Sequence, residues 1–277
     1  MNTLQIEHLS FGFGKKKILQ DISIEFHDGM YGIIGPNGAG KTTFFRCLLN
    51  LYKNNAVVTL NGLKKEDKQF PYKIGFVPQT FSAFSYLTVY EMMEFYANMQ
   101  KLDTALQDER IKECLQFVHL LERADCRISK LSGGMLRRLS IAQAIINNPD
   151  LIIFDEPTVG LDIEEHLHFL NLVNTLAQNK IVILSSHTVA DFQSDNTQLI
   201  LLSKGQITYM GDIAVMCEQA AGHIYEIANE AISKIQGDYR IIKQDMQQLR
   251  FAAKQQQELE PVSPTLEDAY IYYLNFR

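Results

Sequence analysis

Residues 35–43 read Gly-Pro-Asn-Gly-Ala-Gly-Lys-Thr-Thr, a complete phosphate-binding loop of the form G-x-x-x-x-G-K-T. An apolar run at 30–34 precedes the loop and is typical of a strand, and residues 44–49 after it are typical of a helix start. Glycines allow tight turns that point several backbone N–H groups at one anion, and the helix adds its partial positive charge. An ordinary glycine turn is the alternative, but the surrounding strand and helix favour binding of a nucleoside triphosphate.

The composition indicates a globular α/β protein. The chain has 277 residues, of which 46% are hydrophobic and 21% charged, so it can form one large domain with small attachments. Its net charge of −6 argues against broad nucleic-acid binding, which usually shows as a basic excess. No apolar stretch approaches about 18 residues and no signal peptide is evident, so we expect no membrane-spanning segment. Four scattered cysteines favour reduced thiols in a cytosolic protein.

Continuous apolar runs predict the strands of a mainly parallel sheet. Residues 151–154 and 181–184 are apolar throughout, and a helical pattern over 163–178 separates them. This order is typical of a parallel sheet that is covered on both faces. A shorter run at 73–77 predicts a further strand.

Alternating apolar and polar residues predict half-buried strands near the start of the chain. They occur at 3–9 and 18–26. A strand-like run over 57–63 contains Asn61-Gly62, a pair that suits a type I′ hairpin turn. We therefore expect three strands in this part of the chain, the third of which enters a hairpin.

From Thr88 onwards the pattern becomes helical, and a helical subdomain is expected at about 82–140. Four apolar residues recur at helical spacing and predict a face that packs in the core. They are Met92, Phe95, Tyr96 and Met99. Another helix is predicted over 135–147.

The character of the chain changes after about residue 215, which divides it into a main domain, 1–215, and a small accessory subdomain, 216–277. Short strand-like pieces alternate there with glutamine-rich stretches; they lie at 223–227, 239–242 and 249–252. A helix is expected over 265–274, because Thr265 and Asp268 form a capping pair. The accessory subdomain is therefore predicted to be α+β.

Two further stretches carry chemistry. The strand at 151–154 ends in Asp155 and Glu156, where one carboxylate could hold Mg²⁺ and the other could polarise an attacking water. A strand that simply ends in acids is the alternative. Ser132, Gly133 and Gly134 precede the helix at 135–147 and form a second potential anion site. One nucleotide does not need two such sites in one chain, so a second subunit is expected to supply one of them.

These motifs and their order resemble the ATP-binding cassette (ABC) ATPases, the nucleotide-binding subunits of ABC transporters. The resemblance covers about residues 3–212. Its motifs are the Walker A loop at 35–43, the Q-loop glutamine Gln79, the signature at 131–135, Walker B at 151–156, the D-loop at 160–162 and the H-loop at 186–187. The resemblance implies an α/β fold with a P-loop NTPase core, an antiparallel β subdomain, a helical signature subdomain and a small C-terminal α+β extension.

The resemblance also implies site residues for ATP and Mg²⁺. The catalytic residues would be Glu156 as general base, His187 on the γ-phosphate and Lys41. The ATP contacts would be Phe13 stacked on adenine, Gly35, Pro36, Asn37, Gly38, Ala39, Gly40, Lys41, Thr42, Thr43 and Gln79. The Mg²⁺ ligands would be Thr42, Gln79 and Asp155. Ser132, Gly133 and Gly134 would contact ATP across the dimer, where Asp162 reports between subunits. For Phe13, an ordinary core aromatic is the alternative.

Two departures from the family pattern stand out. Met135 replaces the glutamine that commonly ends the signature, so we expect altered dimer contacts with ATP binding retained. Val159 and Gly160 replace the commoner serine and alanine before Leu161-Asp162. Arg137 and Arg138 are interpreted as a solvated or interface face of the signature helix, and a specific contact to phosphate is the alternative.

The resemblance implies a separate membrane permease as partner, a second ABC ATPase subunit, most simply an identical one, and a place on the cytoplasmic face of a bacterial membrane. Aromatic residues that could line the permease groove are Phe81, Phe84, Tyr86, Tyr90, Phe95 and Tyr96; core packing is the alternative for about half of them. Residues 263–274 resemble the end of ATPases paired with ABC-2-type export permeases. Export of a small molecule, peptide or lipid is therefore expected. The alternatives are an importer subunit, a soluble cassette protein acting on ribosomes or DNA, and a regulatory module that holds ATP without turnover.

Overall fold

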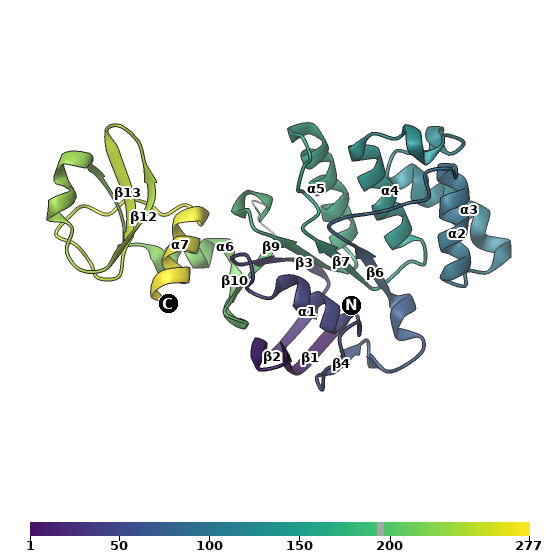
Figure 1. Cartoon of the computed structure of the whole chain (residues 1–277), viewed down its shortest axis with the longest axis horizontal. Coiled ribbons are helices and arrows are strands. Elements are labelled where there is room, and N and C mark those ends of the chain that lie inside the picture. Colours follow the sequence, from purple (N-terminus) through teal and green to yellow (C-terminus); the bar gives the residue numbers. More distant parts are fainter. Residues whose placement is uncertain (193–196) are drawn as a thin grey trace.

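The computed structural model describes residues 1–192 and 197–277. The described residues form three sheets with helices packed around them. The two larger sheets and most helices make one body, and the third sheet stands apart at the C-terminal end (Figure 1). Within the described ranges, no helix is long and apolar enough to cross a membrane.

The central sheet has the order β10-β9-β3-β8-β7-β6 and is parallel except for its β9–β10 hairpin. Its strands are β3 (Gly29–Ile34), β6 (Ile74–Val77), β7 (Leu151–Asp155), β8 (Ile181–Ser186), β9 (Thr197–Ser203) and β10 (Gln206–Asp212). Every residue of β7 and β8 is buried. Alternate side chains enter two different cores, as Ile152 and Ile153 do, because successive residues of a strand face opposite sides. The predicted parallel sheet is confirmed.

One face of the central sheet is covered by α1 (Lys41–Leu48) and a second, antiparallel sheet. Its strands are β1 (Thr3–Phe13), β2 (Lys16–His27), β4 (Val57–Leu60) and β5 (Leu63–Lys64), in the order β2-β1-β4-β5. Asn61 and Gly62 have φ angles of 52° and 79°. Positive φ at both central residues is what a type I′ turn requires, so the predicted hairpin is confirmed.

The other face is covered by helices α4 (Gly133–Ile145) and α5 (Ile163–Ala177), and α2 (Val89–Met99) and α3 (Thr104–Phe117) pack against α4. A capping box of Thr88 and Glu91 begins α2. The predicted core face of α2 is partly wrong, because Phe95 is 40% and Met99 61% exposed. Met92 is buried, so the inner face of α2 is narrower than the spacing of its apolar residues indicates.

Five short 3₁₀ helices connect the described elements. They are η1 (Phe70–Lys73), η2 (Leu121–Arg123), η3 (Ile128–Lys130), η4 (Val189–Phe192) and η5 (Asn229–Lys234). The chain leaves the central sheet through α6 (Ile213–Ala220) and builds a three-stranded sheet in the order β11-β13-β12. Its strands are β11 (Ile224–Ala228), β12 (Tyr239–Gln244) and β13 (Gln248–Ala253), and α7 (Leu266–Phe276) closes the chain.

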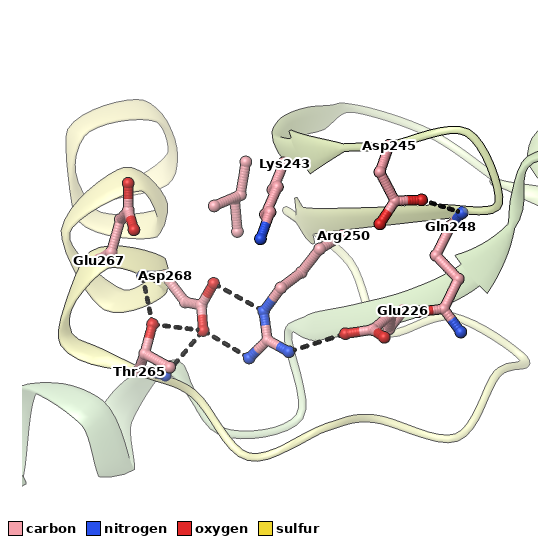
Figure 2. A pocket seen from close by; sticks show the side chains of 9 residues that line it. Glu226, Lys243, Asp245, Gln248, Arg250, Thr265, Glu267 and Asp268 are labelled. Carbon is pink, nitrogen blue, oxygen red and sulfur yellow. Dashed lines mark hydrogen bonds and ion pairs between the residues drawn. The ribbon is translucent and has the colours of Figure 1, made fainter.

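An ion-pair cluster attaches the start of α7 to the three-stranded sheet (Figure 2). Arg250 on β13 donates two hydrogen bonds to Asp268, at 2.9 and 2.6 Å, and one to Glu226, at 3.0 Å. Burial pushes the pKa of Asp268 up, but the hydrogen bonds from Arg250 and Thr265 outweigh it and hold that pKa below the usual value. Thr265 and Asp268 also form the predicted capping box. The charges at this cavity of about 340 Å³ therefore serve to hold α7 in place.

Candidate site for nucleotide binding and hydrolysis

The phosphate-binding loop joins β3 to α1 at the carboxyl edge of the central sheet. Gly38 and Gly40 have φ angles of 80° and 113°, which L side chains rarely adopt. Gly35 is needed for a different reason: a Cβ there would lie 2.2 Å from the carbonyl oxygen of Leu202 on β9. The loop thus depends on glycine for two turns and for one close approach between strands.

A cavity of about 480 Å³ lies over this loop. Residues 37–43 line it, together with Gln79 and Glu156 from the ends of β6 and β7. Lys16 and Ile18 of β2 also line it and were not predicted. Phe13, the proposed adenine contact, pairs with Lys16 across the β1–β2 turn and is exposed, so it is not a core aromatic.

Lys41 is the first residue of α1 and its side chain is only 5% exposed. Its Nζ donates a hydrogen bond to the carbonyl oxygen of Gly35 at 2.7 Å and lies 3.7 Å from Glu156 Oε1. Burial lowers the pKa of Lys41, and the nearby carboxylates of Glu156 and Asp155 oppose that shift. The ammonium group is therefore held inside the loop, where a phosphate oxygen would replace the carbonyl as its partner.

Asp155 is buried at the end of β7 and faces the hydroxyl of Thr42. Thr42 Oγ1 donates to Asp155 Oδ1 at 3.3 Å, and Ser185 Oγ donates to the same oxygen at 2.8 Å. Burial raises the pKa of Asp155, and both hydrogen bonds oppose the shift. A hydroxyl and a carboxylate at this separation are oxygen ligands that Mg²⁺ accepts, with water completing its shell. The donor pair of Thr42 and Asp155 thus fits a magnesium ion.

Three side chains from separate loops converge on the carboxylate of Glu156. Gln79 Nε2 donates to Glu156 Oε2 at 3.1 Å, and His187 Nδ1 lies 3.7 Å from the same oxygen. The third is Lys41, described above. Glu156 has a φ of 45°, and its backbone N–H donates to Ser185 Oγ at 3.0 Å. A non-glycine residue in the left-handed region costs about 1 kcal/mol or more, which the surrounding contacts must offset.

The signature residues lie apart from this cavity. Ser132 is the N-cap of α4 and accepts a hydrogen bond from the backbone N–H of Met135 at 3.2 Å. Gly134 faces Glu165 on α5, which leaves no space for a Cβ. Gly133 lines a separate cavity of about 240 Å³ together with Gln79 and Gly160. Among the residues lining the cavity over the phosphate loop, there is none from the signature.

Asp162 is the N-cap of α5 and accepts a hydrogen bond from the backbone N–H of Glu165 at 2.9 Å. Its carboxylate therefore fixes the start of α5, directly after the D-loop. Ile163 and Val159 on either side of it are exposed. The D-loop thus presents apolar side chains to the surface of this chain.

Arg137 is a site residue that the sequence interpretation missed. Its guanidinium donates to the carbonyl oxygens of Pro78 at 2.8 Å, Gln79 at 3.4 Å and Glu156 at 3.3 Å. Burial lowers its pKa. Of the two alternatives, the solvated face is therefore wrong for Arg137, which links the signature helix to the Q-loop and to Walker B. No local spacing could have indicated this, since its acceptors are backbone groups of distant segments.

Replacing Asp155 with Asn should raise the stability of the nucleotide-free protein and abolish Mg²⁺-dependent turnover. The raised pKa means that the folded state binds protons more tightly than the unfolded state does. Stability is then lost as the pH rises from about 4 through the folded-state pKa, and the neutral amide removes this loss. We expect a rise in melting temperature of about 2–4 °C at pH 7. An unchanged or lower melting temperature would contradict the destabilising effect of this carboxylate.

Comparison with known proteins gives a consistent result. The sequence profile of a family described as ABC transporter matches residues 19–159. The linearmycin resistance ATP-binding protein of Bacillus subtilis (strain 168) is 34% identical over 224 residues, which is 79% of this chain and 72% of that protein. A Nod factor export ATP-binding protein I of Cupriavidus pinatubonensis is 30% identical over 240 residues, covering 84% and 74% of the two chains.

Solved structures resemble the chain as well. An ATP-binding subunit of an ABC transporter superimposes with a TM-score of 0.69 at 25% identity, covering 78% of this chain and 92% of that one. The ADP conformation of an ATP-binding cassette of an ABC transporter gives a TM-score of 0.66 at 24% identity, covering 76% and 91%. Because the second structure is only 24% identical in sequence, its similarity supports the fold alone. The residues that match the family profile, 19–159, include the phosphate loop, Walker B and the signature.

Proposed function

The chain belongs to the ABC transporter family as an ATP-binding subunit that couples ATP hydrolysis to transport, and from this we propose that it drives export through a separate membrane permease. The observation that carries the assignment is the convergence of Lys41, Gln79 and His187 on Glu156, beside the phosphate-loop cavity. These groups come from four separate segments of the chain. A purely structural carboxylate would not need a cation, an amide and a histidine around it.

The roles of the residues follow from this geometry. Glu156 takes a proton from the attacking water, whose oxygen bonds to the γ-phosphorus as the bond to the bridging oxygen of ADP breaks. His187 orients that water and the γ-phosphate, and Lys41 offsets the charge on the β- and γ-phosphates. Thr42, Asp155 and Gln79 would hold Mg²⁺, which neutralises phosphate charge when bound. Phe13, whose strand partner Lys16 lines the cavity, would stack on the adenine.

We assign the second half of the site to another copy of the chain. Ser132, Gly133 and Gly134 do not line the cavity over the phosphate loop. A second subunit that presents its own signature would complete the phosphate contacts with a helix N-terminus. The exposed Ile163 and Val159, on either side of the D-loop aspartate, offer apolar surface for such a contact.

Export is favoured over import by two observations. Among the relatives, one carries linearmycin resistance in its name and another Nod factor export. Residues 263–274 resemble the ends of subunits paired with ABC-2-type permeases, and most of this stretch lies in α7. We therefore place the chain on the cytoplasmic face of a membrane, serving export of a small molecule, peptide or lipid.

An aromatic surface on the helical region supports a permease contact. The side chains of Phe84 and Tyr86 are exposed, and their ring centroids lie 5.8 Å apart. The ring centroids of Phe84 and Phe95 lie 5.6 Å apart. Tyr96 continues the cluster at 5.7 Å from Phe95. Contiguous exposed aromatic side chains are typical of protein–protein contacts. We call Phe84, Tyr86 and Phe95 the aromatic patch.

Tyr90 does not belong to this patch. Its hydroxyl donates to Asp108 at 2.8 Å, which joins α2 to α3. This hydrogen bond raises the pKa of Tyr90 to about 12. Its hydroxyl is thus engaged with α3, and we leave Tyr90 out of the aromatic patch.

Replacing Phe84 and Phe95 together with Ser should weaken binding to the permease by about tenfold or more, because central aromatic contacts dominate interface energies. ATP affinity should stay within about twofold, since both residues lie outside the cavity over the phosphate loop. Leu106→Ser is the matched control, because Leu106 is exposed on α3 of the same region. The measurement is co-purification of the tagged chain with the co-expressed membrane protein of the neighbouring gene. Equal recovery of the membrane protein with the parent, the double variant and Leu106→Ser would contradict the role of the aromatic patch as a docking surface.

The proposed function is tested by that partner itself. We expect a neighbouring gene to encode a protein with about six apolar segments of ~20 residues each, and this protein to stimulate ATP turnover of the chain in vesicles. Transport out of the cell should fail when either gene is deleted. Stable association of the chain with ribosomes or DNA, and none with that membrane protein, would refute the transport assignment.

A further inference from the structure

A buried carboxylate on η4, outside the proposed catalytic set, connects three segments of the chain. Asp191 is 4% exposed, and its Oδ2 accepts hydrogen bonds from Thr158 Oγ1 at 2.8 Å and from Ser186 Oγ. Its Oδ1 lies 2.9 Å from His166 Nε2, at ion-pair distance although not aligned for a hydrogen bond. Burying a carboxylate is costly unless such partners compensate it, so this arrangement constrains all three segments together.

Each partner of Asp191 stands next to a residue with a proposed role. Thr158 follows Glu156 by two positions, and Ser186 directly precedes His187. His166 lies one helical turn after Asp162. We propose that Asp191 is a positioning residue for ATP hydrolysis. It sets the separation between the loop that carries the general base and the loop that carries the histidine. The proposal rests on the roles assigned to Glu156 and His187 above.

The hydroxyl of Ser186 transmits this constraint to the histidine. Ser186 Oγ donates to Asp191 and accepts a hydrogen bond from the backbone N–H of Thr188 at 2.9 Å. Ser186 and Thr188 flank His187. The hydrogen bond between them closes the turn around the histidine, and Asp191 fixes the Ser186 hydroxyl that accepts this bond. His187 itself is half exposed and makes its contact to Glu156 at 3.7 Å. Its ring therefore depends on its backbone for orientation.

Packing around η4 makes it a firm support for this carboxylate. Phe192 is fully buried against Gly32 of β3, where a Cβ would lie 2.4 Å from the phenyl ring. The helix α7 also packs against η4. Asp191 is thus attached to the central sheet and to the C-terminal extension, and the loops it binds are the parts that would move if it were lost.

The test compares steady-state turnover and ATP binding of the full chain for Asp191→Asn, His187→Ala and the double variant. The neutral amide loses the charge-assisted hydrogen bonds, so Asp191→Asn should lower kcat by about tenfold. The Kd for ATP should stay within about twofold, because the partners of Asp191 lie outside the phosphate loop. In the His187→Ala background the same change should lower turnover by less than about twofold, because its effect runs through the histidine.

A second pair of variants covers the case in which Asp191→Asn does not fold. Thr158→Val removes one donor to Asp191, whereas Thr158→Ser keeps the hydroxyl and should restore most of kcat. Thr175→Val is the matched control, since the Thr175 hydroxyl donates only to the backbone of its own helix. Circular dichroism and melting temperature establish that each variant is folded.

The outcomes separate this inference from the proposed function. If His187→Ala hydrolyses ATP at the parental rate, the catalytic role proposed for His187 is wrong, and the positioning role of Asp191 is overturned with it. If His187→Ala is slow but Asp191→Asn keeps the parental kcat, only the inference about Asp191 is overturned. Equal losses from Asp191→Asn in both backgrounds would also overturn it, because they would indicate a general structural effect.

Discussion

Glu156→Gln is expected to lower ATP turnover by about 1,000-fold or more while leaving ATP binding within about threefold of the parent. The amide keeps the size and the hydrogen-bonding capacity of the side chain toward Gln79 and His187, but it cannot take a proton from the attacking water. Bound ATP then persists between two subunits. We therefore expect the variant to elute as a dimer in the presence of ATP and Mg²⁺, and as a monomer after their removal.

The matched control for this change is Glu109→Gln, which alters an exposed glutamate on α3. It should hydrolyse ATP at the parental rate and show no trapped dimer. Phosphate release and size-exclusion chromatography measure both properties on the same preparations. Turnover of the Glu156→Gln variant at the parental rate would remove Glu156 from the role of general base.

Lys41→Met should have the opposite signature and weaken ATP binding by about 100-fold or more, because charge-assisted bonds to phosphate are lost. The stability of the nucleotide-free protein should remain within about 1 kcal/mol, because replacing a buried ion by an apolar side chain of similar length removes a desolvation penalty. Equilibrium ATP binding and urea unfolding measure the two effects. Lys53→Met, at an exposed lysine, is the control and should change neither.

The lowered pKa of Lys41 adds a pH signature to this prediction. A lysine whose folded-state pKa lies below 10.5 binds fewer protons when folded, so stability rises with pH between the folded-state pKa and 10.5. The parent should show this rise in the absence of nucleotide, and Lys41→Met should lack it. Equal pH dependence of the two proteins would mean that the lysine is not desolvated in the nucleotide-free state.

Much of the fold could be predicted because its signals are local. Residues 151–154 and 181–184 are apolar throughout, a pattern typical of strands that are buried on both faces of a sheet, and both strands are buried. Asn61-Gly62 and the pair of Thr265 and Asp268 encode a turn and a helix start through their own backbone and side-chain chemistry. The β9–β10 hairpin and α6 were not predicted, since their short segments lack an equally distinct periodicity.

Other predictions were wrong because contacts with residues distant in the sequence decide which side chains are buried and what they bind. Phe95 and Met99 share the helical spacing of Met92, yet they are exposed, because the neighbouring helices cover only part of α2. Arg137 is held by the carbonyl groups of two loops. Side-chain type and spacing do not carry such information.

The sequence by itself determined that this protein has a phosphate-binding loop, a strand ending in two carboxylates, and a separate signature with its own helix N-terminus. Each of these is a short stretch whose backbone chemistry is complete within about ten residues. Only the tertiary structure decided that Lys41, Gln79 and His187 meet at Glu156, and that Asp191 joins the segments beside them. The physical reason is that contacts between the ends of parallel strands depend on strand order and register, which long-range packing sets.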